Sequence, residues 1–110
     1  MATFEEILHQ CNETRKYRPV VDAIPYAGLI GLDYQRFGND VIFKLPDNPD
    51  NIGNPILPAV HGGVVGGFME LSAAIHLVMM LDTPAMPKIV DFSLDYLRPV
   101  RGGKDTFAEC

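Results

Sequence analysis

The first apolar positions of the chain recur at helical spacing. They lie three and four residues apart and share one face of a helix: Phe4, Ile7, Leu8 and Cys11. Thr3 followed by Glu6 has the spacing of a capping box, in which two side chains satisfy free N–H groups of the first helical turn. The pattern predicts a short amphipathic helix over about residues 4–14.

Two short apolar runs follow, separated by residues that favour a turn. We expect strands over 29–34 and 41–45, joined through Gly38, Asn39 and Asp40. Basic residues and prolines before the first strand predict a turn-rich link over 15–25. Residues 47–58 are rich in proline and asparagine and predict a loop, and a loop of that length in a compact domain is more often functional.

The longest apolar stretch runs from Val60 to Leu81 and carries one full charge, at Glu70. Its apolar residues step by four and three and form one stripe, which predicts a core helix packed on a sheet: Val64, Phe68, Leu71, Ile75 and Val78. Its length also suits a membrane span, but the central carboxylate and the absence of basic or Trp/Tyr anchors at its ends argue against one. We therefore expect no membrane.

The last third of the chain changes to a period of two. After a proline-marked link over 83–87, apolar and polar residues alternate from Val90 to Tyr96, the cleanest strand signal in the chain. Another strand begins at 106–108. One long helix between strands predicts an α+β fold with an antiparallel sheet.

Composition narrows the class of protein. The 110 residues suit a single domain, 1–110, and nine basic against fourteen acidic side chains give a net charge of −5, which argues against a nucleic-acid partner. Cys11 and Cys110 stand far apart without metal-ligand spacing, so we expect no metal site and a reducing compartment. Glu5 and Glu6 stand where a signal peptide would need a basic start, so we expect a cytoplasmic protein.

A second face of the long helix carries the candidate chemistry. Four glycines in six positions lead to Glu70, and glycine inside a helix costs about 1 kcal/mol relative to alanine, so close approach to another group is expected. Free N–H groups of Gly62 and Gly63 at the helix start could polarise an acyl oxygen, and a desolvated Glu70 could act as base or nucleophile. The alternatives are a Glu70 that reaches solvent or an arginine, and a His61 that only caps or packs.

These residues resemble a known family. The run from Ala59 to Gly63, Glu70 nine residues after His61, and the stretch 89–103 (IVDFSLDYLRPVRGG) are similar to hotdog-fold thioesterases, more narrowly the phenylacetate-degradation and 4-hydroxybenzoyl-CoA thioesterase branch. The resemblance covers about residues 25–108. It implies a long helix wrapped by a curved antiparallel sheet, in a dimer that is often doubled to a tetramer.

The resemblance also implies roles for single residues. Gly62, with Gly63, would polarise the thioester carbonyl while His61 shapes the turn, and Glu70 would act across a dimer interface. The family commonly has a polar residue six positions before the histidine; Pro55 stands there, so Asn54 would serve only if the loop bulges by one residue. Related chains continue through further strands, so we expect the 110 residues to be incomplete and to lack the last strands of the sheet.

A basic cluster follows the alternating segment. Arg98, Arg101 and Lys104 place three of nine basic residues within seven positions, which suits the phosphates of coenzyme A, although a solvated turn has the same composition. The favoured function is acyl-CoA thioester hydrolysis without a cofactor other than the coenzyme A of the substrate. A hotdog module that binds acyl-CoA without cleaving it is the alternative, and a hydratase is disfavoured because Leu57 stands where its histidine is needed. The acyl group, and whether coenzyme A or acyl-carrier protein leaves, stay open.

Overall fold

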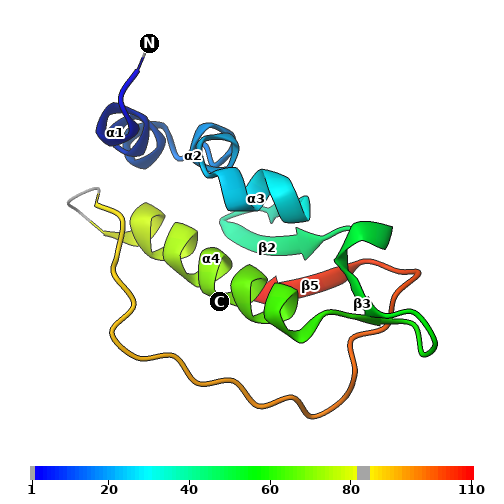
Figure 1. The fold of residues 1–110 in the computed structure, drawn as a ribbon. Helices are drawn as coiled ribbons and strands as arrows, with labels where there is room; N and C mark the ends of the chain where they lie inside the picture. The colour runs from blue at the N-terminus through cyan, green and yellow to red at the C-terminus, as the bar shows by residue number, and fades with distance from the viewer. Residues whose placement is uncertain (1, 82–84) are drawn as a thin grey trace.

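The long central helix organises the structure. The computed structural model describes residues 2–81 and 85–110, and Figure 1 shows helix α4 (Gly62–Met80) running through the middle of it. Three shorter helices precede the sheets: α1 (Phe4–Thr14), α2 (Arg18–Ala23) and α3 (Pro25–Ile30). The larger sheet is antiparallel with strand order β1-β2-β5, from β1 (Asp33–Phe37), β2 (Asp40–Leu45) and β5 (Thr106–Glu109). A short 3₁₀ turn, η1 (Pro49–Asn51), leads into a second antiparallel pair, β3 (Ile52–Asn54) and β4 (Ala59–Val60).

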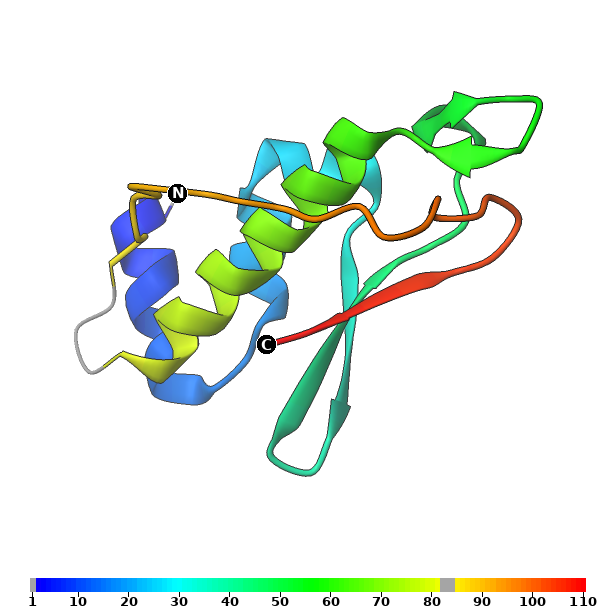
Figure 2. The same ribbon diagram turned by 90° about the horizontal axis from the view of Figure 1, so that it is seen from below.

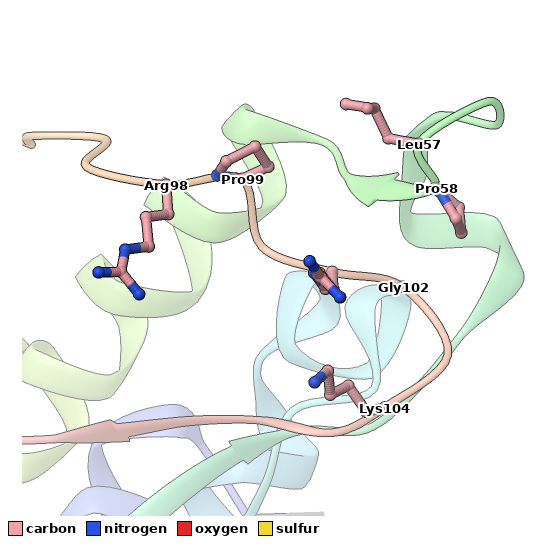
Figure 3. Close-up of a pocket in the computed structure, with 7 residues that line it drawn as sticks. Leu57, Pro58, Arg98, Pro99, Gly102 and Lys104 are labelled. Atoms are coloured by element: carbon pink, nitrogen blue, oxygen red, sulfur yellow. The ribbon is translucent and has the colours of Figure 1, made fainter.

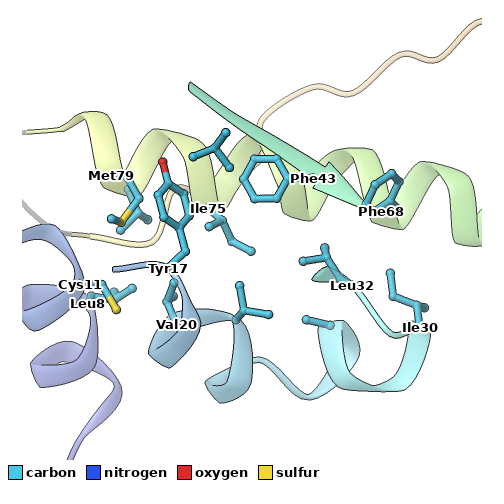
Figure 4. Close-up of a cluster of buried hydrophobic side chains, with 14 of the residues drawn as sticks. Leu8, Cys11, Tyr17, Val20, Ile30, Leu32, Phe43, Phe68, Ile75 and Met79 are labelled. Carbon is cyan, nitrogen blue, oxygen red and sulfur yellow. The ribbon is translucent and has the colours of Figure 1, made fainter. Parts of the chain in front are cut away.

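The apolar stripe of α4 forms the centre of the core, as its spacing predicts. Phe68, Ile75 and Val78 are buried against α1, α2, α3 and the sheet (Figure 4). The far end of the helix is closed by α1, because the Asn12 side chain donates to the carbonyls of Val78 at 2.9 Å and Leu81 at 2.7 Å. These bonds satisfy carbonyl groups that have no partner inside a helix.

The region before the sheet differs from the sequence prediction. Residues 15–25 were expected to be a link and 29–34 a strand, but Arg18–Ala23 and Pro25–Ile30 are helices. Each helix has a proline in its first turn, where the missing N–H has no intrahelical partner to lose. In the sequence, a proline in the first turn of a helix has the same appearance as a proline that marks a turn. The prolines of residues 15–25 were therefore wrongly interpreted as part of a link. Gly31 ends α3 with φ = 80°.

The hairpin of the larger sheet confirms the predicted turn. Phe37 pairs with Asp40, and Gly38 takes φ = 64°, a conformation that glycine adopts without strain. The strand predicted from residue 106 also forms: β5 pairs with β2 in a register that places Ala108 opposite Phe43. β5 has no second neighbour among the described strands.

Residues 85–98, which we call the strap, form no strand, although the alternation from Val90 to Tyr96 predicted one. The strap runs as an extended chain antiparallel to α4 (Figure 2). Val90 is 99% exposed and Leu97 is 89% exposed. Alternation prepares one face for burial, but a strand exists only where a second backbone lies beside it. The predicted link over 83–87 lies partly outside the described residues.

Candidate active site

The start of α4 is built by the side chain of His61. Its Nδ1 accepts the Gly63 N–H at 2.9 Å, so the histidine is the N-cap of the helix. The His61 carbonyl accepts the N–H groups of Val64 and Val65, and the His61 N–H donates to the Asn51 carbonyl at 2.8 Å. Among the described residues, the Gly62 N–H is thus left without an acceptor. The prediction that Gly63 also polarises a carbonyl is not supported, since its N–H already has a partner.

Asn51 holds the turn before the helix, and sequence reasoning missed it. The residue is buried, and its side-chain amide donates to the Ile30 carbonyl at 2.8 Å while its own carbonyl accepts from His61. Gly53 lies so close to this turn that a Cβ on it would stand 2.8 Å from the His61 Cα. An asparagine in a proline-rich loop looks like a turn residue, so only its burial reveals the role.

The predicted Asn54 is engaged elsewhere. Its side-chain oxygen accepts the N–H groups of Ile56 at 3.0 Å and Leu57 at 3.3 Å, which folds the loop between β3 and β4. The residue is exposed. Its geometry is that of an Asx turn, and in this conformation its oxygen organises the loop.

Two tyrosines cover the glycines of α4. The Tyr26 ring lies over Gly67, where a Cβ would stand 2.6 Å from the phenol oxygen. On another face, Tyr96 of the strap lies over Gly62 and Gly66, and its O–H donates to the Gly62 carbonyl at 2.7 Å. The close approach that the glycines predict is therefore an approach of aromatic side chains.

Glu70 lies two turns further along α4 and is exposed. Among the described residues it forms neither an ion pair nor a side-chain hydrogen bond, so the expected desolvation is not found within one chain. Eight residues separate it from Gly62, which is a rise of about 12 Å along an α-helix. A group bound to the Gly62 N–H is therefore out of reach of the Glu70 carboxylate of the same chain.

The three predicted basic residues meet at one cavity of about 690 Å³. Figure 3 shows two of these lining residues, Arg98 just before Pro99 and Lys104 beyond Gly102. Its lining holds no acidic residue: Leu57, Pro58, Arg98, Pro99, Arg101, Gly102 and Lys104. Among the described residues, none of the three cations forms an ion pair, so their charges are free to meet an anion.

A smaller apolar cavity of about 290 Å³ adjoins the basic one. The two cavities share Arg98 and Pro99, and the smaller one reaches Gly62 at the start of α4. Val65, Tyr96 and Leu97 supply much of its apolar wall. An anionic group in the large cavity and an apolar group in the small one would thus lie side by side, with the Gly62 end of the helix next to the apolar group.

The turn that carries Lys104 is held by two carboxylates. Asp47 accepts the Gly103 N–H at 3.0 Å, and Asp105 accepts the Asp47 N–H at 3.0 Å. The hydrogen bond from the Asp47 N–H, with Lys44 3.3 Å from the other oxygen, holds the pKa of Asp105 below its ordinary value. Both acids are therefore occupied in shaping the turn.

Other candidate chemistry is limited. Within residues 2–81 and 85–110, no three His, Cys, Asp or Glu side chains gather as metal ligands would. Cys11 is buried and Cys110 is exposed, and neither forms a disulfide. α4 has the length and composition of a membrane span, but its core face packs inside the protein.

The chain is similar to a protein family and to several solved structures. A model of the thioesterase superfamily matches residues 57–110. A solved structure from Chromobacterium violaceum is 39% identical with a TM-score of 0.69, and the match covers 93% of this chain and 69% of that one. A Pseudomonas aeruginosa protein is 29% identical with a TM-score of 0.67, over 86% of this chain and 72% of that one.

A Shewanella oneidensis protein described as related to the thioesterase superfamily is 27% identical with a TM-score of 0.60, over 93% of this chain and 72% of that one. No curated protein matches the chain. The long helix and antiparallel sheet are those of the hotdog fold, an α+β class. The match of residues 57–110 to the thioesterase superfamily supports thioester hydrolysis at a coarse level; the narrower branch rests on the sequence resemblance.

Proposed function

We propose that this protein hydrolyses an acyl-CoA thioester. The observation that carries the proposal is the Gly62 N–H, which has no acceptor among the described residues and lies at the positive end of a helix beside an apolar cavity. A thioester carbonyl oxygen that accepts this N–H gains stabilisation as negative charge develops on it. The match of residues 57–110 to the thioesterase superfamily supports the reaction class.

Glu70 supplies the second half of the proposed reaction. As a general base, its carboxylate takes a proton from water while the water oxygen bonds to the carbonyl carbon. The C–S bond then breaks, and the proton passes to the departing thiolate. As a nucleophile, a Glu70 carboxylate oxygen would bond to the carbonyl carbon while the C–S bond breaks and coenzyme A leaves as the thiolate. Water then opens the resulting anhydride, which restores Glu70, and a proton from that water passes to the thiolate. Both routes yield a free acid and coenzyme A, and both need the carboxylate within contact of the carbonyl carbon.

The distance between these two groups supports a dimer. Because Gly62 and Glu70 of one chain lie about 12 Å apart along the helix, a complete site needs Glu70 from a second copy. The strap offers the surface for such a copy, since Val90 and Leu97 are almost fully exposed. We propose a homodimer at minimum, in which each site combines residues of both chains, and a tetramer as a further step.

The basic cavity is the proposed site for the phosphates of coenzyme A. Arg98, Arg101 and Lys104 place three positive charges around it in a protein of net charge −5. Guanidinium groups bind phosphate through paired hydrogen bonds. Because Arg98 borders both cavities, the coenzyme and the acyl group would continue from one into the other. This favours acyl-CoA over acyl-carrier protein as the substrate.

Release of free thiol from short, medium, long and aromatic acyl-CoAs tests the proposal. Glu70→Gln is expected to fold normally, because Glu70 is exposed and has no side-chain partner within residues 2–81 and 85–110, and to lose about 10²-fold or more in kcat. Glu13→Gln, an equally isosteric change at an exposed position of α1, is the matched control and should keep the wild-type kcat. Wild-type turnover in Glu70→Gln contradicts the catalytic role.

The second candidate is a module that binds acyl-CoA without cleaving it. The exposure of Glu70 within one chain favours it, since such a carboxylate is not yet desolvated. Under this alternative, acyl-CoA binds at the basic cavity, no thiol is released, and Glu70→Gln leaves the binding constant unchanged. Calorimetry of wild type and variant beside the thiol assay separates the two functions.

A further inference from the structure

Tyr96 contacts the helix start through both its ring and its hydroxyl group. Its O–H donates to the Gly62 carbonyl at 2.7 Å. Its ring carbon lies 3.5 Å from the position of a Gly62 Cβ, and its oxygen lies 3.6 Å from that of a Gly66 Cβ, both ordinary van der Waals distances. Although it belongs to the strap, Tyr96 is thus seated on the first turn of α4.

That turn has little stability of its own. Four of the first six residues of α4 are glycine, each of which costs about 1 kcal/mol relative to alanine. A helix start of this composition frays unless tertiary contacts hold it. A hydrogen-bond donor that stabilises developing charge must keep its position within a fraction of an ångström. Whatever holds this turn therefore bears on the proposed chemistry.

The peptide group between Gly62 and Gly63 is held at both ends. Its carbonyl accepts from Tyr96, and its N–H donates to the His61 Nδ1 at 2.9 Å. Hydrogen bonds on opposite ends of one peptide polarise and strengthen each other. This peptide adjoins the Gly62 N–H through a single Cα, so fixing its plane also restricts the direction in which that N–H points.

We propose that Tyr96 is a positioning residue, which holds the first turn of α4 so that the Gly62 N–H keeps one orientation toward the thioester carbonyl. The inference rests on the proposed function and extends it from the helix to the strap. The strap then supplies Arg98 for the coenzyme and Tyr96 for the helix start, two positions apart in the sequence.

Tyr96→Phe tests this role because it removes the hydroxyl and keeps the ring. We expect kcat to fall about tenfold while KM stays within about twofold, the scale of one hydrogen bond felt mainly in the transition state. Tyr26→Phe is the matched control. Its phenol also lies over a glycine of α4 but makes no hydrogen bond among the described residues, so its kcat should stay at the wild-type value.

Amide hydrogen exchange gives a second readout that does not depend on activity. Exchange at Val64 and Val65 should speed up in Tyr96→Phe and stay unchanged in Tyr26→Phe. Equal exchange and equal kcat in both variants overturn the proposal, and so does a parallel loss in both. If the wild-type protein releases no thiol, the proposed function fails, while the exchange comparison still decides whether Tyr96 holds the turn.

Discussion

The two faces of α4 meet very different surroundings. On one face, Phe68 and Ile75 are almost completely buried by helices and strands of the same chain. On another, the strap covers the helix only in part, and its own Val90 and Leu97 stand in solvent. The core face of α4 and the strap both have a clear amphipathic pattern in the sequence, yet only the core face is buried.

The spacing of apolar and polar residues therefore predicts which side chains are suited to burial, but it does not predict which segment covers them. The core face is buried by α1, α2, α3 and β2 of the same chain. The strap belongs to neither sheet, and the outer edge of β5 has no neighbour among the described strands. An exposed run of alternating apolar residues with free backbone groups is a surface that favours pairing with another strand.

The largest expected effect separates the two regions directly. Phe68→Ala leaves a cavity in a region that cannot collapse, so the free energy of unfolding should fall by about 3–5 kcal/mol. Val90→Ala should change it by less than about 0.5 kcal/mol at a chain concentration that keeps the protein monomeric. Urea unfolding of both variants measures the contrast. A large loss in monomeric Val90→Ala would mean that the strap is part of the core.

Charge on the strap tests whether a second copy covers it. Leu97→Asp places a carboxylate in the proposed interface, where burial without a partner is unfavourable, and should weaken self-association ten- to hundredfold. Leu29→Asp is the control, since Leu29 is 72% exposed on α3, away from the strap. Sedimentation velocity over a range of protein concentrations measures the self-association of both variants. Equal association of the two variants removes the strap from the interface.

Two neighbouring glycines allow a finer comparison of the helix faces. Gly67→Ala brings a Cβ to 2.6 Å from the Tyr26 hydroxyl, so the ring must move, and we expect a loss of about 1–2 kcal/mol. Gly66→Ala meets Tyr96, Leu94 and Phe92 at 3.6 Å or more. It should stabilise the helix by up to about 1 kcal/mol. Thermal unfolding measures both, and a stable Gly67→Ala contradicts tight packing by Tyr26.

The smallest effect concerns the basic cluster of Arg98, Arg101 and Lys104. Arg101→Ala should raise KM for acyl-CoA several-fold and leave kcat nearly unchanged, because a phosphate contact far from the thioester holds ground state and transition state alike. KM should rise with salt in the wild type and less in the variant, since salt screens the contact. A thioester without the nucleotide should show neither effect. If the wild type and Arg101→Ala have the same KM and the same salt dependence, the basic cluster is a solvated turn that does not bind the coenzyme.

Local patterns predicted the elements well where one segment supplies its own signal. The helix over 4–14, its Thr3 cap, the turn at Gly38 and the core stripe of α4 are all confirmed. Errors occurred where proline starts a helix, in α2 and α3, and where a strand needs a neighbour, in the strap. The basic cluster was predicted as a group, and its residues line one cavity.

The sequence by itself determined which residues bear the candidate chemistry: His61, Gly62 and Glu70 at the start and in the middle of one helix, and a basic cluster that begins with Arg98 at the end of the strap. Only the tertiary structure decided how they are used. It gave the Gly63 N–H to His61, engaged Asn54 in its own loop, and laid Tyr96 on the helix start. The reason is that hydrogen bonds and close contacts join residues far apart in the chain, and spacing along a sequence contains no information on the distance between them.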